Sequence, residues 1–185
     1  MADEPFDPKS DKTMGYHLFL EPEGGLAARL KGIIEQLAQA YGGPVFAPHV
    51  TLLARIPAPD ESTAIKHAKA VAAVLSPQTL TLGLLASEDS YYRALYSQIR
   101  EQDEMRACHA RASELFGTEL NPAYLAHLSL FYGIDLPPGT IGNAAADVPP
   151  LEGMAFTADR IHLYRTEGVV GEWHEVGVFP FGANA

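Results

Sequence analysis

The segments Pro48-His49-Val50-Thr51-Leu52 and Ala126-His127-Leu128-Ser129-Leu130 repeat one pattern, in which a hydroxyl residue follows a histidine by two positions. The chain has seven histidines, and only His49 and His127 have Thr or Ser at that position. Side chains alternate along a β-strand, so residues two apart project from the same face. We therefore expect each segment to be a strand that presents a histidine and a hydroxyl together.

The patterns around these two segments predict an α+β chain. Apolar residues spaced three and four apart indicate helices, and alternating or β-branched runs indicate strands. Helices are expected at residues 26–41, 60–75 and 101–116, and strands at residues 14–21, 49–56, 79–87, 91–99, 124–133, 156–165 and 172–180. Residues 137–150 are rich in Pro, Gly and Ala and are expected to form a linker with room for one helical turn.

A helix, a Gly- or Pro-containing turn and a histidine strand follow one another twice, in residues 26–53 and 103–131. This repetition predicts two related lobes around a pseudo-twofold axis. A chain of 185 residues is long enough for one such domain. We place it at residues 14–181, with residues 1–13 as a flexible N-terminal tail.

The charge balance bears on the class of substrate. The formal net charge of −10 disfavours a long nucleic acid as a partner, because proteins that grip a polyanion usually carry a basic face. A small anionic substrate held in a local pocket is expected instead.

The chain also lacks the patterns of a secreted or membrane protein. Residues 1–13 are polar and acidic without the apolar stretch of a signal peptide. The longest apolar run, residues 70–75, is too short to span a bilayer. A cytoplasmic protein without membrane partners, expected to be a monomer, is the default.

Cys108 is the only cysteine, so no intrachain disulfide and no thiolate metal cluster can form. It lies in a helical pattern and is interpreted as a small buried hydrophobe. A Cys108–His109 nucleophile pair is disfavoured because adjacent helix residues point about 100° apart.

Two histidines and two hydroxyls are the parts needed to cleave a phosphate ester. A neutral imidazole can take a proton from an attacking water, and a protonated one can give a proton to the leaving oxygen. The hydroxyls of Thr51 and Ser129 can donate hydrogen bonds to the non-bridging oxygens, where charge must be stabilised. His49 and His127 are therefore the candidate catalytic residues. Which of them is the base and which the acid is open.

Two other interpretations of the histidines compete with this one. A histidine in a strand is often a satisfied interior polar group, but a matched second copy favours function. A zinc site needs three or four ligands, and no Asp, Glu or Cys lies at a short spacing from either segment. No metal or other cofactor is expected.

With these residues in view, the chain resembles the two-histidine phosphoesterase superfamily, whose signature is two copies of His-x-[Thr/Ser]-x with a hydrophobic last position. Within it, the chain is most similar to the plant and fungal cyclic nucleotide phosphodiesterases. The supporting segments are Gly15-Tyr16-His17-Leu18-Phe19-Leu20, Phe46-Ala47-Pro48-His49-Val50-Thr51 and His127-Leu128-Ser129-Leu130-Phe131-Tyr132-Gly133, with the strand expected to contain Trp173.

The resemblance implies a bilobal α+β fold in which two antiparallel sheets line a central groove and helices lie outside. It implies metal-independent opening of small cyclic phosphates. The substrates would be ADP-ribose 1″,2″-cyclic phosphate, giving ADP-ribose 1″-phosphate, and nucleoside 2′,3′-cyclic phosphates, giving 2′-phosphates. It assigns substrate contact to Tyr132, although strict alternation from Ser129 puts Tyr132 on the opposite face. The redox-responsive cysteine pair of the plant enzymes is absent.

Further residues and rival functions complete the expectations. Arg55 falls nominally on the cavity face, where it could steer an anion, although a solvated strand-end arginine is favoured. Tyr16 and Trp173 could stack a base, although core packing is favoured. One rival function is a cyclic phosphodiesterase or 2′-5′ ligase of the same superfamily that acts on RNA ends. The other is a nucleotide-binding module without catalysis.

Overall fold

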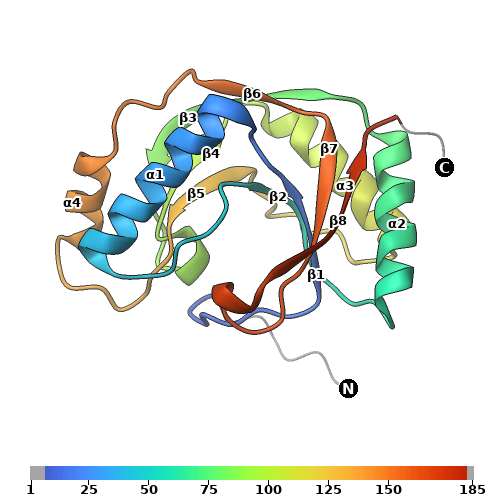
Figure 1. Ribbon diagram of the computed structural model, residues 1–185, viewed down its shortest axis with the longest axis horizontal. Helices are drawn as coiled ribbons and strands as arrows, with labels where there is room; N and C mark the ends of the chain where they lie inside the picture. Colours follow the sequence, from blue (N-terminus) through green and yellow to red (C-terminus); the bar gives the residue numbers. More distant parts are fainter. Residues whose placement is uncertain (1–6, 183–185) are drawn as a thin grey trace.

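The computed structural model describes residues 7–182, which form an α+β fold of one sheet and surrounding helices (Figure 1). The α-helices in this range are α1 (Gly24–Tyr41), α2 (Glu61–Val74), α3 (Gln102–Phe116) and α4 (Thr140–Asp147), and the short 3₁₀ helices are η1 (Tyr91–Arg93) and η2 (Val170–Glu172). The strands in this range are β1 (Tyr16–Leu20), β2 (Val50–Ile56), β3 (Gln78–Ala86), β4 (Leu95–Ile99), β5 (His127–Phe131), β6 (Ala155–Ala158), β7 (Arg160–Arg165) and β8 (His174–Pro180).

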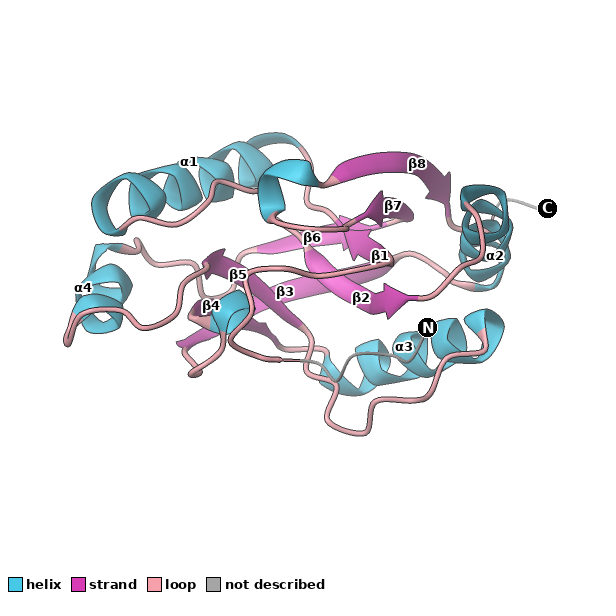
Figure 2. Cartoon of the chain, turned by 90° about the horizontal axis from the view of Figure 1, so that it is seen from below, coloured by secondary structure: helices cyan, strands magenta, loops and turns pink. Residues whose placement is uncertain are grey.

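The strands form a single curled antiparallel sheet in the order β6-β3-β4-β5-β2-β1-β7-β8 (Figures 1 and 2). The expectation of two separate sheets is therefore wrong. The two groups of four strands are joined at the centre, where Val50 of β2 pairs with Leu128 of β5. Backbone hydrogen bonding at this junction makes one sheet out of what the motif repeat divides into two halves.

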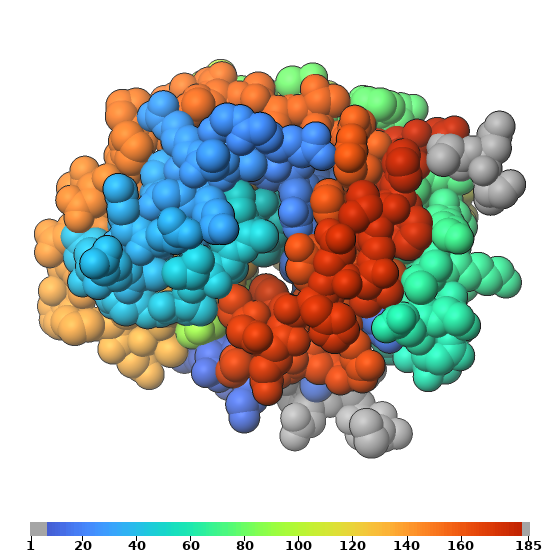
Figure 3. Space-filling view, in the orientation of Figure 1, coloured from blue at the N-terminus to red at the C-terminus, as the bar shows by residue number. Residues whose placement is uncertain are grey.

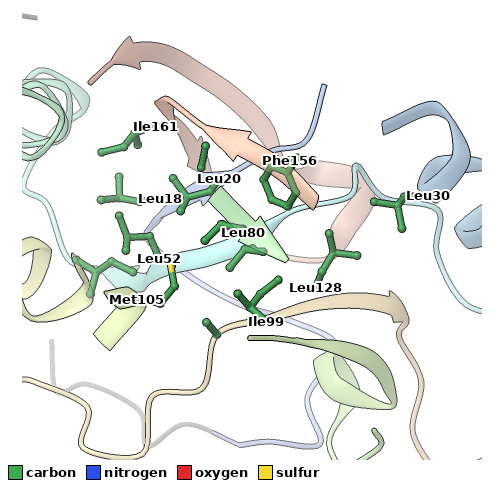
Figure 4. Close-up of a cluster of buried hydrophobic side chains, with 14 of the residues drawn as sticks. Leu18, Leu20, Leu30, Leu52, Leu80, Ile99, Met105, Leu128, Phe156 and Ile161 are labelled. Carbon is green, nitrogen blue, oxygen red and sulfur yellow. The ribbon is translucent and has the colours of Figure 1, made fainter. Parts of the chain in front are cut away.

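The face of the sheet that meets the helices holds one continuous core (Figure 4). Val50 and Leu52 of β2 and Leu128 and Leu130 of β5 are fully buried there. Helix α1 packs against β5, whereas α3 packs against β2. Helix α1 precedes the His49 segment in the chain but packs on the strand of the His127 segment, and α3 does the reverse. Burial of apolar surface in these contacts therefore holds the two segments side by side.

The expected helices at 26–41, 60–75 and 101–116 are confirmed. In the expected linker, residues 140–147 form the two-turn helix α4, which packs against α1. The single strand expected at 156–165 is two strands, because β6 pairs with β3 at one edge of the sheet and β7 pairs with β1 in the other half. Alternation of side chains does not reveal such a change of partner.

The chain before β1 crosses two loops of the molecule. The carbonyl of Pro8 accepts hydrogen bonds from the Tyr91 amide and the Ser90 hydroxyl. Thr13 forms a β-bridge with Gly168. The segment around residues 8–13 thus contacts both η1 and the turn that precedes η2, while the first six residues of the expected tail lie outside the described range.

Across residues 7–182, no helix has both the length and the apolar character needed to cross a membrane.

Candidate active site

The pairing of β2 with β5 brings both histidine segments to one place. Val50 lies opposite Leu128 in an antiparallel register. One step along β2 is one step back along β5, so this register places His49 opposite Ser129 and Thr51 opposite His127. These four side chains project from the face opposite Val50 and Leu128, away from the main core. The two expected His–hydroxyl pairs therefore share one face of the sheet.

His49 is held on two sides. Its Nδ1 lies 2.7 Å from the carbonyl oxygen of Ala47, and its ring stacks on Phe19 of β1 with centroids 3.8 Å apart. Phe19 faces His49 because it pairs with Thr51 across β1 and β2. The His49 side chain is consequently fixed by contacts with Ala47 and Phe19, and only 6% of its surface is exposed.

His127 has the same backbone anchor. Its Nδ1 lies 2.8 Å from the carbonyl oxygen of Leu125, and its ring meets the ring of Tyr96 edge-on at 5.1 Å. A carbonyl oxygen can only accept, so Nδ1 carries the proton in both neutral histidines. Each neutral imidazole therefore keeps a lone pair on Nε2, the nitrogen available to a substrate or a water.

Burial lowers the pKa of each histidine from 6.5 to about 4. The charge of a protonated His127 lowers the pKa of His49 further. For His127, Arg93 also lowers the pKa and Glu88 raises it. Both imidazoles are therefore neutral near pH 7 when the site is empty, and protonating one disfavours protonating the other.

The two hydroxyl residues differ in their surroundings. Ser129 is buried, and its hydroxyl donates a hydrogen bond of 2.7 Å to the backbone carbonyl of Tyr92 in η1. Thr51 is half-buried, with its backbone carbonyl accepting from the Tyr124 phenol at 2.9 Å. The Ser129 hydroxyl must therefore break its hydrogen bond to the Tyr92 carbonyl before it can donate to a phosphate oxygen.

Tyr132 lies on the side of Ser129, contrary to strict strand alternation. Strand β5 ends at Phe131, so Tyr132 is free of the strand geometry. Its ring stacks on Phe46 at 3.8 Å, and its phenol lies within hydrogen-bonding reach of the Ser129 hydroxyl. Burial raises the pKa of this phenol, which keeps it neutral.

An aromatic cluster closes this face of the sheet. Tyr92 of η1 contacts both Tyr132 and Trp173, the residue that follows η2. The cluster, which is separate from the main core, consists of Ile34, Phe46, Tyr132 and Val170 with Tyr91, Tyr92 and Trp173 packed on it. In the space-filling view the molecule is hollowed where β1, the segment before β2 and the C-terminal strands meet (Figure 3). Phe19 lies on β1, His49 directly precedes β2, and Trp173 directly precedes β8.

The other residues singled out from the sequence are Tyr16, Trp173 and Arg55. Tyr16 is buried in the main core, as favoured, whereas Trp173 borders the site and is partly exposed. Arg55 has a left-handed backbone (φ 54°) in the stretch between Leu53 and Ile56 where the register of β2 with β1 shifts, and its charge lowers the pKa of His17. Arg55 is therefore close enough to His17 for its charge to act on that imidazole.

Cys108 and His109 do not form a nucleophile pair. Burial raises the pKa of the half-buried Cys108 thiol, which keeps it protonated. His109 is buried under Tyr124, and its Nδ1 donates to the carbonyl of Leu52 at 2.8 Å. His109 thus braces the backbone of β2 from the helix side.

Three site residues were missed from the sequence. His17 lies on the same face of β1 as Phe19, and Arg93 and Glu88 form an ion pair of 2.8 Å beside His127. The spacing of His17 from Phe19 was the available signal, since residues two apart share a strand face. No local pattern marks Arg93 and Glu88, because the turn at η1 brings them together.

Among residues 7–182, no group of three or more His, Cys, Asp or Glu side chains is arranged to hold a metal ion.

Comparison with known proteins agrees with this architecture. A model of the 2′-5′ RNA ligase superfamily matches residues 22–169. A protein of Arabidopsis thaliana named cyclic phosphodiesterase is 24% identical over 157 residues, covering 82% of this chain and 85% of that protein.

Solved structures share the fold. TT0787 of Thermus thermophilus matches with a TM-score of 0.65 at 16% identity, over 93% of this chain and 100% of that one. LigT of E. coli in its apo form matches with a TM-score of 0.60 at 15% identity, over 92% of this chain and 98% of that one.

Proposed function

Because the chain belongs to the 2′-5′ RNA ligase superfamily, we propose that it is a phosphoesterase that hydrolyses small cyclic phosphodiesters without a metal ion. The observation that carries this proposal is the pair of imidazoles of the buried His49 and the half-buried His127, each with Nδ1–H bound to a carbonyl and Nε2 available. The relative named cyclic phosphodiesterase supports the same reaction type. The proposed substrates are ADP-ribose 1″,2″-cyclic phosphate and nucleoside 2′,3′-cyclic phosphates.

In the proposed reaction, one water is added across a P–O bond. Nε2 of the neutral histidine accepts a proton from water as the water oxygen bonds to phosphorus. Nε2–H of the protonated histidine gives its proton to the leaving oxygen as that P–O bond breaks. The first histidine ends protonated and the second neutral, so one proton exchange with solvent restores the site. Each transfer typically contributes about 10²–10⁴-fold in rate.

The hydroxyls and the tyrosine take supporting roles in the proposal. Thr51 lies opposite His127, and Ser129 lies opposite His49, so the two hydroxyls flank the space between the imidazoles. They would hydrogen-bond the non-bridging phosphate oxygens, where negative charge concentrates. Tyr132, beside Ser129, would orient that hydroxyl or contact the phosphate itself.

The decisive experiment is turnover of adenosine 2′,3′-cyclic phosphate and ADP-ribose 1″,2″-cyclic phosphate in EDTA, with product analysis. His49→Ala and His127→Ala are each expected to lower kcat by about 100-fold or more, because each removes one proton transfer. His174→Ala, at an exposed position, is the matched control. Wild-type turnover in either folded active-site variant, or loss of wild-type activity in EDTA, would contradict the proposal.

The matching family model is named for 2′-5′ RNA ligases, so action on RNA ends is the second candidate. The net charge of −10 and the burial of His49 favour a small substrate. Comparing kcat/KM for adenosine 2′,3′-cyclic phosphate with that for an RNA oligomer ending in a 2′,3′-cyclic phosphate decides between them. Tight nucleotide binding with no product from either substrate would indicate a binding module.

A further inference from the structure

His17 is a third histidine on the face that carries His49 and His127. It lies on β1 two residues before Phe19, with the two ring centroids 5.7 Å apart, and Phe19 in turn stacks on His49. Only 8% of the His17 surface is exposed. Buried polar rings normally have both nitrogens satisfied or serve a function.

One nitrogen of His17 has a fixed role. Thr166 Oγ1 contacts both the carbonyl oxygen of Gly15, at 3.2 Å, and Nδ1 of His17. The hydroxyl has one proton, and a carbonyl can only accept. Both contacts are satisfied together when Thr166 donates to Gly15 and accepts from Nδ1–H of His17. Nε2 of His17 then carries a lone pair.

The surroundings of the His17 ring place it toward the site rather than the core. The rings of His17 and Trp173 are nearly parallel, at 18° with centroids 6.4 Å apart, and Trp173 is partly exposed. Burial, His49 and Arg55 lower the pKa of His17 to about 3. The imidazole is therefore neutral throughout the physiological range, an acceptor rather than an acid or base.

We propose that His17 is a specificity-determining residue whose Nε2 accepts a hydrogen bond from an N–H or O–H donor on the nucleoside part of the substrate. This proposal rests on the proposed function for the identity of the substrate. A neutral acceptor beside Trp173 and Phe19 suits an uncharged donor on a sugar or base, and it offers nothing to the phosphate, which is itself an acceptor.

The sharpest test uses two substitutions of His17, each of which keeps a polar group at only one of the two ring-nitrogen positions. In His17→Asn the amide occupies the place of Nδ1 and keeps the contact with Thr166, but Nε2 is lost. In His17→Gln the amide reaches the place of Nε2, but the contact with Thr166 is lost. We expect His17→Asn to raise KM about three- to tenfold with little change in kcat, and His17→Gln to recover most of this loss.

The opposite ranking overturns the proposal. If His17 only supports the fold through Thr166, His17→Asn behaves as wild type and His17→Gln is impaired. The pH profile of kcat/KM should keep its shape in His17→Asn, since a neutral acceptor does not titrate there. A changed shape would assign proton transfer to His17 instead. His67→Asn, on the outer helix α2, is the matched control.

Binding can be measured without turnover, which separates this proposal from the proposed function. Trp173 is the only tryptophan and lies beside His17, so its fluorescence reports ligands at this end of the site. Adenosine 2′-phosphate is the probe, and His17→Asn should weaken its Kd about three- to tenfold. If wild-type protein binds the probe but hydrolyses no cyclic phosphate, only the proposed function fails. No saturable signal up to about 10 mM, well above usual KM values, overturns both.

Two substrate analogues identify the donor. The 2′,3′-cyclic phosphate of purine riboside lacks the amino group of adenine, and that of 5′-deoxyadenosine lacks the 5′ hydroxyl. The effect of His17→Asn should vanish in the analogue that lacks the contacted donor. An undiminished effect in an analogue lacking both groups contradicts the proposal.

Discussion

At the scale of single residues, the two imidazoles of the site are oriented by their own neighbours in the chain. Each Nδ1–H donates to the carbonyl of the residue two positions earlier, Ala47 for His49 and Leu125 for His127. The backbone of each repeated segment therefore sets the tautomer of the histidine that the segment carries. The low pKa of both histidines has a different origin, since it comes from burial by other elements and from their mutual proximity.

This low pKa predicts the pH dependence of the reaction. With both pKa values near 4, the free enzyme that carries one proton on the pair is most abundant near pH 4 and declines about tenfold per pH unit at higher pH. We expect kcat/KM for a cyclic nucleotide to fall between about pH 5 and 7.5. The kcat profile should lie at higher pH, because a bound phosphate anion favours the protonated histidine. A kcat/KM that rises across this interval would contradict this assignment.

At the scale of elements, β2 departs from a regular strand where it borders the site. Its register with β1 shifts twice, which turns both Leu52 and Leu53 into the core. The backbone carbonyl of Thr51 accepts a hydrogen bond from the Tyr124 phenol, and that of Leu52 accepts one from Nδ1 of His109. Bulges of this kind re-aim side chains, and Arg55 lies within the shift between Leu53 and Ile56.

The segment between α1 and β2 depends on close contact with the end of β5. Gly43 has φ 94°, and a Cβ there would lie 2.7 Å from the carbonyl oxygen of Tyr132. Gly42 also has a positive φ, 82°, but a Cβ there would meet nothing within 4 Å. A substitution at Gly42 therefore introduces backbone strain alone, whereas a substitution at Gly43 adds a steric clash with Tyr132.

Gly42→Ala is expected to cost about 1–3 kcal/mol of unfolding free energy, because φ 82° with ψ −174° is a backbone region almost restricted to glycine. Gly43→Ala should cost at least about 1 kcal/mol more, because the segment must shift away from Tyr132. It should also lower kcat/KM, since Phe46 and His49 lie on the displaced segment. Urea unfolding and turnover of both variants check this, and equal losses in the two variants would show that the contact with Tyr132 is unimportant.

At the scale of the whole molecule, the buried His17 and His49 and the half-buried His127 make the fold sensitive to acid. Burial lowers the pKa of His17 to about 3 and those of His49 and His127 to about 4, against 6.5 for an unburied histidine. Between these values the unfolded chain binds more protons than the folded one, so stability rises with pH in this window and falls as pH drops below 6.5.

Each of these histidines is expected to lower the unfolding free energy by about 2 kcal/mol between pH 7 and pH 5. The double variant His49→Gln/His127→Gln should therefore lose markedly less stability over this interval than the wild type. Urea unfolding at the two pH values measures the difference. An unchanged acid sensitivity in the variant would mean that the histidines are not buried as neutral groups.

Local periodicity was enough to predict much of the molecule. The spacing of two in His49–Thr51 and His127–Ser129 determined that each pair shares a strand face, and apolar spacing located α1, α2 and α3. Where partners lie far apart in the chain, periodicity was insufficient. It did not show that β6 and β7 are separate strands in different halves of the sheet, or that the two halves form one sheet.

The sequence by itself determined the chemistry that the site offers: two imidazoles, two hydroxyls and their orientation along each strand. Only the tertiary structure decided how these parts meet. The junction of Val50 with Leu128 sets the two pairs side by side, and the aromatic cluster buries them. The tertiary structure also brings the Ser129 hydroxyl to the carbonyl of Tyr92 and places His17 on the same face of the sheet. The physical reason is that side-chain direction follows the local backbone, whereas pairing, burial and pKa depend on contacts between segments distant in the chain.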